Sequence, residues 1–423
     1  MVTAYMYGEK AMTAYKWLAL FMVSSVLILA FPLGIVADRS NPVSEIFVPV
    51  GVSIQEAINN AAEGDTIIIQ NGVHIEEQYP IFVNKSVTLL GENVAQSIVD
   101  ADGTTVGIFL VSASNSRISG VTVQNTSQSA SGIHLAHVVN VEISNCTITG
   151  CPTGIQLTDS TSGNITMNQI VSNLGPGIYM HTSSSYNKIV GNNITDNPVG
   201  VQISDMACQD NLFYYNNFIS NAVHQNDIGF NSWNGTYPVG GNYWSNYTSV
   251  DLMNGGGQNV AGSDGIADSA YQDLDWYPLV KPIYFFHMYN WNVKDYYAVI
   301  ATNSTVSSLR FDPSLGTYMN FSVVGDDETT GCCRVAIPKG ALWVDDLSHW
   351  TIVLNETALT AGPLIVEDAD NTYFYFTYDH STQVVRIIGT HIVPEFSLHV
   401  MLALLALFAG MFLLEKKTRR SLL

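Results

Sequence analysis

The 423-residue chain is short of basic residues, with 16 Lys and Arg against 36 Asp and Glu. Only nine of the basic residues lie between residues 40 and 392, a span that holds 32 of the acidic ones. A body of this charge repels phosphate backbones, which argues against nucleic acid as a partner. It suits a solvated exterior, cation binding or neutral glycans.

Cysteine is also scarce, and the five cysteines form neither a metal-binding spacing nor a CxxC motif. Cys146 and Cys151 are close enough in sequence to form a disulfide around one turn. Two separate buried thiols explain this pair equally well. In a strand, the adjacent Cys332 and Cys333 would alternate faces, so that at most one of them points into a core.

Long apolar runs are missing from the body and occur only near the two ends. Two lysines precede the apolar run Trp17–Ala37, so residues 1–37 are predicted to be a signal peptide, with an uncleaved anchor as the alternative. At the other end, Val400–Leu414 is uninterrupted apolar sequence before a basic tail. This pattern predicts a transmembrane helix that holds the body on the outer face of the cytoplasmic membrane.

The triplet Pro394-Glu395-Phe396 stands just before the C-terminal apolar run. With that run and the basic tail it resembles the sorting signals of archaeal surface proteins. The resemblance implies that residues 394–423 are an anchor, which is either kept or replaced by a lipid. Ten Asn-x-Ser/Thr sequons agree with export and are candidate glycosylation sites. They begin at Asn84, Asn125, Asn145, Asn164, Asn193, Asn234, Asn246, Asn303, Asn320 and Asn355.

A repeat of about 23 residues organises the segment 107–218. Glycine followed by alternating aliphatic residues recurs at intervals of 25, 22, 23 and 23 residues. Short alternating runs separated by Gly, Asn and Ser, repeated at this period, predict a solenoid of strands and turns. Two sets of stacked side chains are expected: an inward column of Ile133, Ile155, Ile178 and Val201, and a hydrogen-bonded ladder of Asn168, Asn192 and Asn216.

The segment before the repeat predicts a cap for the open end of the solenoid. Ser53 and Glu56 form a capping box at the start of a short amphipathic helix, which a strand at Thr66–Ile69 follows. This order, together with Gly240–Ser245 and Asp264–Asp268, resembles the NosD-like family of carbohydrate-binding and sugar-hydrolase β-helices over about residues 44–282. The resemblance implies an all-β fold: a right-handed parallel β-helix over residues 44–239 with a C-terminal cap over 240–282.

After Pro282 the repeat stops, and residues 283–391 show the alternation of β-strands. The size and pattern predict a β-sandwich, similar to the membrane-proximal domains beside such sorting signals, and we expect it to be a spacer. Within it, Tyr373–Tyr378 and Val384–Ile388 flank a polar turn, which predicts a hairpin.

No catalytic residue is assigned from the sequence. β-Helices carry several kinds of polysaccharide-processing enzyme, so the fold does not decide the activity. Hydrolysis by paired carboxylates needs acids on neighbouring coils, whereas Asp205 and Asp210 share one coil and Asp159 lies on an earlier one. Whether the protein is an enzyme stays open, and a non-catalytic role is favoured.

Three kinds of binding site are considered. The aromatic residues after the last coil either plug the solenoid or stack on sugar rings, and both can hold for different members. The resemblance also brings a copper label, but scattered histidines and a lone Met180 give no evidence of a copper site. An Asp-rich, Gly-rich loop predicts calcium, with a solvated turn as the alternative. The glycan candidates are Trp233, Tyr237, Tyr243, Trp244 and Trp276; the copper candidates are His134, His137, Met180 and His181; the calcium candidates are Asp251, Asn254, Asp264 and Asp268.

The sequence therefore predicts an exported, surface-anchored β-helix protein that binds glycans or serves as an envelope or adhesion component. Its expected partners are the membrane and either glycans or envelope proteins. The first alternative is a lyase or hydrolase acting on polysaccharides, and the second is an envelope accessory factor of the NosD kind.

Overall fold

The computed structural model describes residues 44–103, 107–127, 130–291, 294–359 and 362–392. The predicted signal segment and the apolar C-terminal run lie outside these residues. Within them, no helix is long and apolar enough to cross a membrane. The described residues from Glu45 onward belong to one compact unit.

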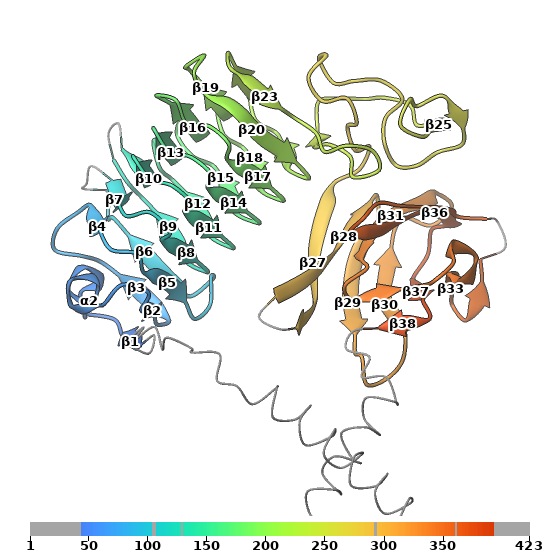
Figure 1. The fold of residues 1–423 in the computed structure, drawn as a ribbon, viewed down its shortest axis with the longest axis horizontal. Helices are drawn as coiled ribbons and strands as arrows, with labels where there is room; N and C mark the ends of the chain where they lie inside the picture. Colours follow the sequence, from blue (N-terminus) through green and yellow to red (C-terminus); the bar gives the residue numbers. More distant parts are fainter. Residues whose placement is uncertain (1–43, 104–106, 128–129, 292–293, 360–361, 393–423) are drawn as a thin grey trace, which may run out of the picture. The chain divides into compact units, whose positions relative to one another are not determined.

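Short strands wind into a right-handed solenoid of about eight turns (Figure 1). Each full turn gives one strand to each of three parallel sheets, which we name A, B and C. Sheet A contains β1 (Glu45–Val48), β2 (Thr66–Ile69), β5 (Thr88–Gly91), β8 (Arg117–Ser119), β11 (Glu142–Ser144), β14 (Asn164–Thr166), β17 (Lys188–Val190), β20 (Gln209–Tyr214) and β23 (Phe230–Ser232). Sheet B contains β3 (Gly72–His74), β6 (Ser97–Asp100), β9 (Thr122–Gln124), β12 (Thr147–Thr149), β15 (Gln169–Val171), β18 (Asn193–Thr195), β21 (Asn217–Ile219) and β24 (Tyr243–Trp244). Sheet C contains β4 (Ile81–Val83), β7 (Gly107–Val111), β10 (Ser131–Ala136), β13 (Thr153–Thr158), β16 (Pro176–His181), β19 (Val199–Ile203) and β22 (Val223–Asp227).

The aliphatic residue after each repeat glycine points into the solenoid. Ile133 pairs with Ile155, Ile155 with Ile178, and Ile178 with Val201, all in parallel register. All four side chains are fully buried, so the predicted inward column is confirmed. Sheet B continues to β24, so the last coil extends beyond the predicted boundary at residue 239.

Ladders of buried asparagines hold all three corners of the coils. The predicted ladder between sheets A and B is present: Asn168 donates to Asn192 and Asn192 to Asn216, both at 3.0 Å. It continues to Asn242 at 2.9 Å. Two more ladders were not predicted. One joins Asn173, Asn197 and Asn221 between sheets B and C, and the other joins Asn187, Asn211 and Asn231 between sheets C and A.

Cys146 and Cys151 take the place of ladder asparagines in an earlier coil. The backbone N–H of Cys146 donates to Asn168, and that of Cys151 donates to Asn173. Both thiols are free and buried, which decides between the two alternatives in favour of separate thiols. Burial raises the pKa of Cys146 to about 12, so this thiol stays protonated and unreactive.

The N-terminal end is covered by α2 (Ile54–Asn60), as predicted. Ser53 is the N-cap and its hydroxyl accepts from the N–H of Glu56, while Ile54, Ala57 and Ile58 are buried. The start of the helix has a second hydrogen-bond acceptor from farther along the chain: the Glu76 carboxylate accepts from the N–H of Ile54 at 2.6 Å. This acceptor satisfies an N–H that the first helical turn leaves free.

Aromatic rings close the C-terminal end. The inward columns change from isoleucine to aromatic residues, and the rings of Phe218 and Trp244 stack at 4.3 Å between centroids. Phe213 stacks on Trp233 at 4.1 Å, and Tyr271 stacks on Trp244 at 4.2 Å. Trp233 and Trp244 are 0% and 1% exposed, so both rings plug the solenoid. The chain then forms the small ribbon β25 (Met253–Asn254) and β26 (Val260–Ala261).

Two five-stranded antiparallel sheets follow and share one buried core, in agreement with the predicted sandwich. The first sheet contains β27 (Ile283–Trp291), β28 (Lys294–Thr302), β31 (Thr330–Pro338), β36 (Asn371–Asp379) and β35 (Leu364–Glu367). The second contains β29 (Thr305–Phe311), β30 (Tyr318–Val324), β37 (Gln383–Ile388), β33 (Thr351–Leu354) and β34 (Thr357–Ala358). Three short elements complete this part: β32 (Leu342–Trp343), the 3₁₀ helix η1 (Leu347–His349) and β38 (His391–Ile392).

The predicted hairpin of residues 373–388 is wrong. β36 pairs with β31 and β35, whereas β37 pairs with β30 and β33 in the other sheet. The polar turn therefore carries the chain from one layer to the other. Two alternating strands around a polar turn have the same local pattern in both arrangements, and long-range pairing decides between them.

Candidate functional site on the outer face of sheet C

Sheet C presents a row of hydrogen-bonding side chains to solvent. Each member lies two residues after a repeat glycine or at the matching position, and the parallel register aligns them on five successive strands. Because side chains alternate along a strand, the inward isoleucine that follows each glycine fixes the next residue as outward. From β10 to β22 the row contains His134, Gln156, Tyr179, Gln202 and Asn226. No member is buried, and none is acidic.

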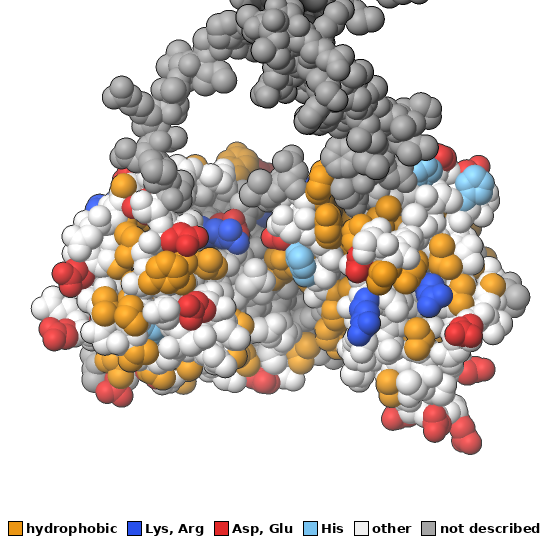
Figure 2. Space-filling model, turned by 90° about the horizontal axis from the view of Figure 1, so that it is seen from below, with side chains coloured by type: hydrophobic (Ala, Val, Ile, Leu, Met, Phe, Trp, Pro, Cys, Tyr) orange, Lys and Arg blue, Asp and Glu red, His pale blue; other side chains and the backbone are white. Residues whose placement is uncertain are grey.

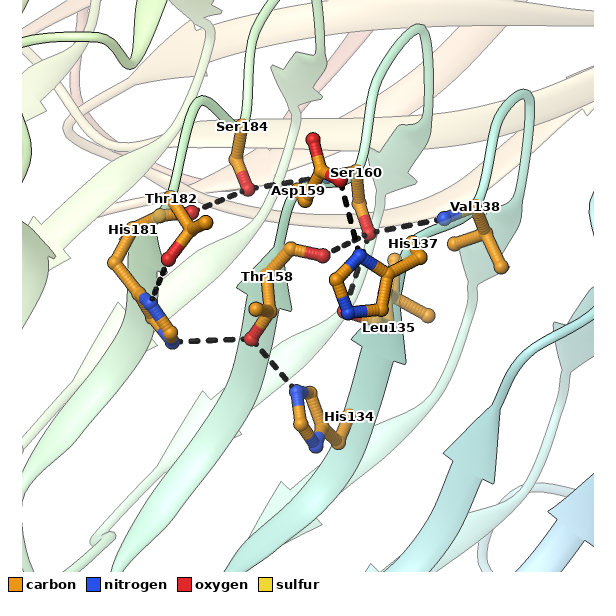
Figure 3. A network of polar contacts seen from close by, with 10 residues as sticks. All are labelled: His134, Leu135, His137, Val138, Thr158, Asp159, Ser160, His181, Thr182 and Ser184. Atoms are coloured by element: carbon orange, nitrogen blue, oxygen red, sulfur yellow. Dashed lines mark hydrogen bonds and ion pairs between the residues drawn. The ribbon is translucent and has the colours of Figure 1, made fainter.

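Hydrogen bonds connect this row to two further polar side chains on sheet C, those of Thr158 and His181 (Figure 3). The Nε2 atoms of His134 and His181 lie 2.8 and 3.0 Å from the same hydroxyl oxygen, Oγ1 of Thr158. Gln156 Nε2 lies 2.9 Å from the His181 ring, and Tyr179 packs against that ring at 4.9 Å between centroids. These contacts hold the side chains in fixed orientations and so preorganise the face for a polar ligand.

Burial lowers the pKa of His134, and the nearby His181 and His137 rings lower it further. The imidazole is therefore neutral at pH 7, with one nitrogen that donates and one that accepts. The row of amide, imidazole and phenol groups, with the Thr158 hydroxyl beside it, offers both donors and acceptors, as hydroxyl-rich ligands require.

At the end of these strands the arrangement looks like part of a catalytic triad, but the third contact is missing. His137 Nδ1 lies 3.0 Å from a carboxylate oxygen of Asp159, and both side chains are exposed. The neighbouring Ser160 is buried, and its hydroxyl donates to the carbonyl oxygens of Leu135 and Thr158. The same oxygen accepts a hydrogen bond from the N–H of Val138 (Figure 3). Ser160 is thus held by the backbone and is not activated by His137.

The sequence could have revealed this face. Gln156, Thr158 and Tyr179 were not among the predicted site residues. The repeat nonetheless carries a signal, because a polar or aromatic residue stands two places after the glycines at 132, 154, 177 and 200. The alternation that identified the inward column would also have placed these residues on the outer face.

The aromatic residues predicted to bind glycans are only partly available. Trp233 and Trp244 are enclosed by other rings, so no sugar can stack on them in this structure. Tyr237 and Tyr243 are half-buried, and Tyr237 lies against Tyr277. Trp276, which is 60% exposed, is the member of this set with a largely free ring.

The predicted calcium ligands lie around one loop, but the carboxylates of Asp251 and Asp268 already accept hydrogen bonds from backbone N–H groups. Asp251 accepts from the N–H groups of Asp264 and Gly265, and Asp268 accepts from Leu252 and Met253. Burial raises the pKa of Asp251 to about 6. Asn254 uses its amide to donate to the carbonyls of residues 261 and 262. Calcium binding at this loop stays a prediction.

None of the ten sequon asparagines is buried. Asn84, Asn145, Asn303 and Asn355 are exposed, and Asn193 is half-buried beside Gln169. Glycosylation at these sites stays a prediction.

The fold and this face define the class of the protein as an all-β protein built on a right-handed parallel β-helix with a hydrogen-bonding outer row. Residues 41–249 match the family model described as periplasmic copper-binding protein (NosD). The solenoid therefore belongs to the NosD-like right-handed β-helix family, as the resemblance implied. No curated protein sequence matches the chain.

Similar solved structures include two pectin methylesterases and an alginate lyase. A pectin methylesterase bound to a hexasaccharide is 13% identical with a TM-score of 0.32, and the match covers 44% of this chain and 67% of that one. The pectin methylesterase of Yersinia enterocolitica is 15% identical with a TM-score of 0.32, at 45% and 77% coverage. A PL6-family alginate lyase is 12% identical with a TM-score of 0.25, at 55% and 42% coverage. These likenesses are too distant to carry an activity over.

The residues on sheet C do not fit the copper of the family description. Met180 lies in the inward column between Leu157 and Ile203 and is fully buried, so its thioether cannot join the outer histidines. Only two imidazoles, those of His134 and His181, converge, and a threonine hydroxyl stands between them. Within the described ranges, no three His, Cys, Asp or Glu residues come together as a metal-binding group.

Proposed function

We propose that this protein is an exported, surface-anchored β-helix protein that binds glycans without transforming them. The observation that supports this most strongly is the outer face of sheet C. There, five neutral polar side chains lie in register on neighbouring strands, and a half-buried tyrosine stands at the centre of the row. Parallel strands are about 4.8 Å apart, so the row presents hydrogen-bonding groups at regular steps along the solenoid.

Sugars suit this face because their hydroxyl groups both donate and accept, while their C–H faces pack on aromatic rings. Gln202 and Asn226 have no side-chain hydrogen bond to any described residue, which leaves two amides for a ligand. The absence of acidic groups from the row supports binding over hydrolysis, since glycoside cleavage by the common mechanism uses two carboxyl groups.

The test is binding of the full chain to an array of neutral and acidic oligosaccharides, in a detergent without a sugar headgroup. We expect the double variant Gln156→Ala/Tyr179→Ala to bind about tenfold more weakly. It loses the donor and the acceptor of one side-chain amide, and one aromatic ring. Tyr186→Ala is the control, since this tyrosine is 63% exposed and lies outside the row. Equal binding by the parent and the double variant would remove the face from the proposal.

The His137–Asp159 pair favours a second candidate, a polysaccharide-processing enzyme. An exposed imidazole held by a carboxylate is a competent general base. Incubating the chain with the glycans it binds and measuring new reducing ends or unsaturated products separates the candidates. Product formation that His137→Ala abolishes would establish the enzyme, whereas binding with no product supports the non-catalytic role.

A further inference from the structure

A groove with a volume of about 480 Å³ lies between sheet B and the first part of β27. Side chains from neighbouring coils, among them Gln169 and Asn193, line one side. The segment Pro282–Phe286 and Tyr297 of β28 line the other. The groove shares no residue with the outer row of sheet C, so it is a separate site.

The two sides of the groove are fastened to each other. The side chain of Asn217 donates to the carbonyl of Ile283 and accepts from its N–H, both at 2.8 Å. Phe285 lies directly on Gly191, where an added Cβ would come within 2.8 Å of the ring, and it meets Tyr215 edge-on. A groove with walls held in this way exists before any ligand arrives, which lowers the entropic cost of binding.

The lining contains no charged residue and no histidine or cysteine. This is notable in a chain with 36 acidic residues, many of which colour the surface in Figure 2. The lining offers no carboxylate, imidazole or thiolate to a metal ion, and no cation to phosphate or uronic acid groups. It selects for an uncharged ligand.

The lining is amphipathic, and several of its polar groups have no partner. Gln169 accepts a hydrogen bond from Asn193 through its side-chain oxygen, and its NH₂ group is unpaired within the described part of the chain. The same holds for the hydroxyls of Tyr284 and Tyr297 and for the amide of Asn145, for which the described residues supply no bond. Tyr284 is 44% exposed, and Phe286 extends the aromatic surface. Rings beside unpaired amides and hydroxyls match the two sides of a sugar, its C–H face and its hydroxyl groups.

We propose that this groove binds a neutral oligosaccharide. The sugar has two available sources. One is a free or surface glycan, and the other is a glycan attached to the chain itself, because Asn145 and Asn193 both line the groove and both begin Asn-x-Thr sequons. The recognition chemistry is the same in both cases.

The first arm of the test uses the full-length Gln156→Ala/Tyr179→Ala variant, which lacks the proposed sheet C face, as its parent. It is produced without N-glycosylation and tested on a panel of neutral and uronic-acid-containing oligosaccharides. We expect binding to neutral members, about tenfold weaker in Gln169→Ala/Tyr284→Ala. Ile219→Trp, which fills the groove from its solenoid side, should abolish that binding. Tyr186→Ala is the matched control, and the melting temperature shows whether each variant is folded.

The second arm uses the chain from a host that glycosylates sequons. A sugar found by mass spectrometry on Asn145 or Asn193, together with loss of free-sugar binding that Asn145→Gln/Asn193→Gln restores, identifies the attached glycan as the ligand. Unmodified asparagines with retained binding identify a free glycan. The proposal is overturned if the unglycosylated chain binds no neutral oligosaccharide, or if folded groove variants bind as the parent does. If Tyr179→Ala weakens binding and none of the folded groove variants does, the face on sheet C stands and the groove does not.

Discussion

Asn192 shows how a single buried amide supports three coils. Its NH₂ group donates to Ile165 O and to Asn216, while its oxygen accepts from the backbone and side chain of Asn168. We predict that Asn192→Ala lowers the free energy of unfolding by about 2–4 kcal/mol, because it leaves buried donors and acceptors without partners. The measurement is denaturant unfolding followed by circular dichroism.

The control for this prediction is Asn226→Ala, at an exposed asparagine in sheet C. This substitution is expected to lower the free energy of unfolding by less than about 0.5 kcal/mol, as most surface substitutions do. If the two variants unfold alike, the ladder does not stabilise the corner.

A buried carboxylate in the C-terminal cap makes stability depend on pH. Burial raises the pKa of Asp275 to about 7, although it accepts from Asn242 N–H, the Trp244 indole and Tyr277 N–H. Between about pH 4 and 7 the folded protein therefore keeps a proton that the unfolded chain has lost. The free energy of unfolding contributed by this group is highest below pH 4 and falls as pH rises, by up to about 1.4 kcal/mol per pH unit.

Asp275→Asn removes this titration, so we expect the variant to lose less stability than the parent between pH 4 and 7. Unfolding free energies at four pH values from 4 to 8 test this, and the other buried acids cancel because both proteins contain them. Parallel curves for parent and variant would contradict the raised pKa.

At single positions the sequence predicts whether a side chain is buried better than it predicts what that side chain does. Alternation placed Ile155 inward, and the same rule would have placed Tyr179 outward on the candidate face. The plug by Trp233 and Trp244 was one of two stated alternatives, and only the packing of other rings against them decides it. Composition identifies an aromatic cluster, but which face of a ring stays free depends on three-dimensional contacts.

Among the elements, β13 offers the cleanest test of the coil register. We predict that Ile155→Asp destabilises the solenoid by more than about 4 kcal/mol, because a carboxylate enters a column with no partner for it. Gln156→Asp, on the outer side of the same strand, is the control and should change stability little. Thermal unfolding of the two variants gives the comparison, and an unchanged transition in Ile155→Asp would refute the register.

The elements of the solenoid were predictable because one period repeats with the same local pattern. The two additional asparagine ladders were missed, although the spacing between Asn173 and Asn197 and between Asn187 and Asn211 is the same 24 residues as in the predicted one. The hairpin of β36 and β37 failed for a different reason, since each strand pairs with residues far away in sequence. Local alternation carries no information on which layer a strand joins.

For the whole molecule, the C-terminal run outside the described residues predicts how the protein is held at the surface. Deleting residues 397–423 is expected to release the body into the medium, because it removes the predicted span and its basic tail. Cell fractionation followed by immunoblotting measures this. Continued membrane association would make Trp17–Ala37 the anchor instead.

The groove on sheet B could not be foreseen from the sequence. Gln169 and Tyr284 are more than one hundred residues apart, and neither belongs to a motif. Their proximity results from the closed C-terminal end of the solenoid, which directs the chain back along sheet B through the bonds of Asn217. Such a site depends on tertiary packing and leaves no local pattern.

The asparagine ladders at the three corners also restrict how this molecule can change in length. A residue inserted into a strand directly beside a ladder asparagine would shift that amide out of line with its neighbours above and below, and the loss would affect both adjacent coils. Removing or duplicating a complete unit of 24 residues, such as 169–192, leaves every amide facing another amide. The length of the outer row on sheet C therefore changes in whole coils, each of which adds about 4.8 Å.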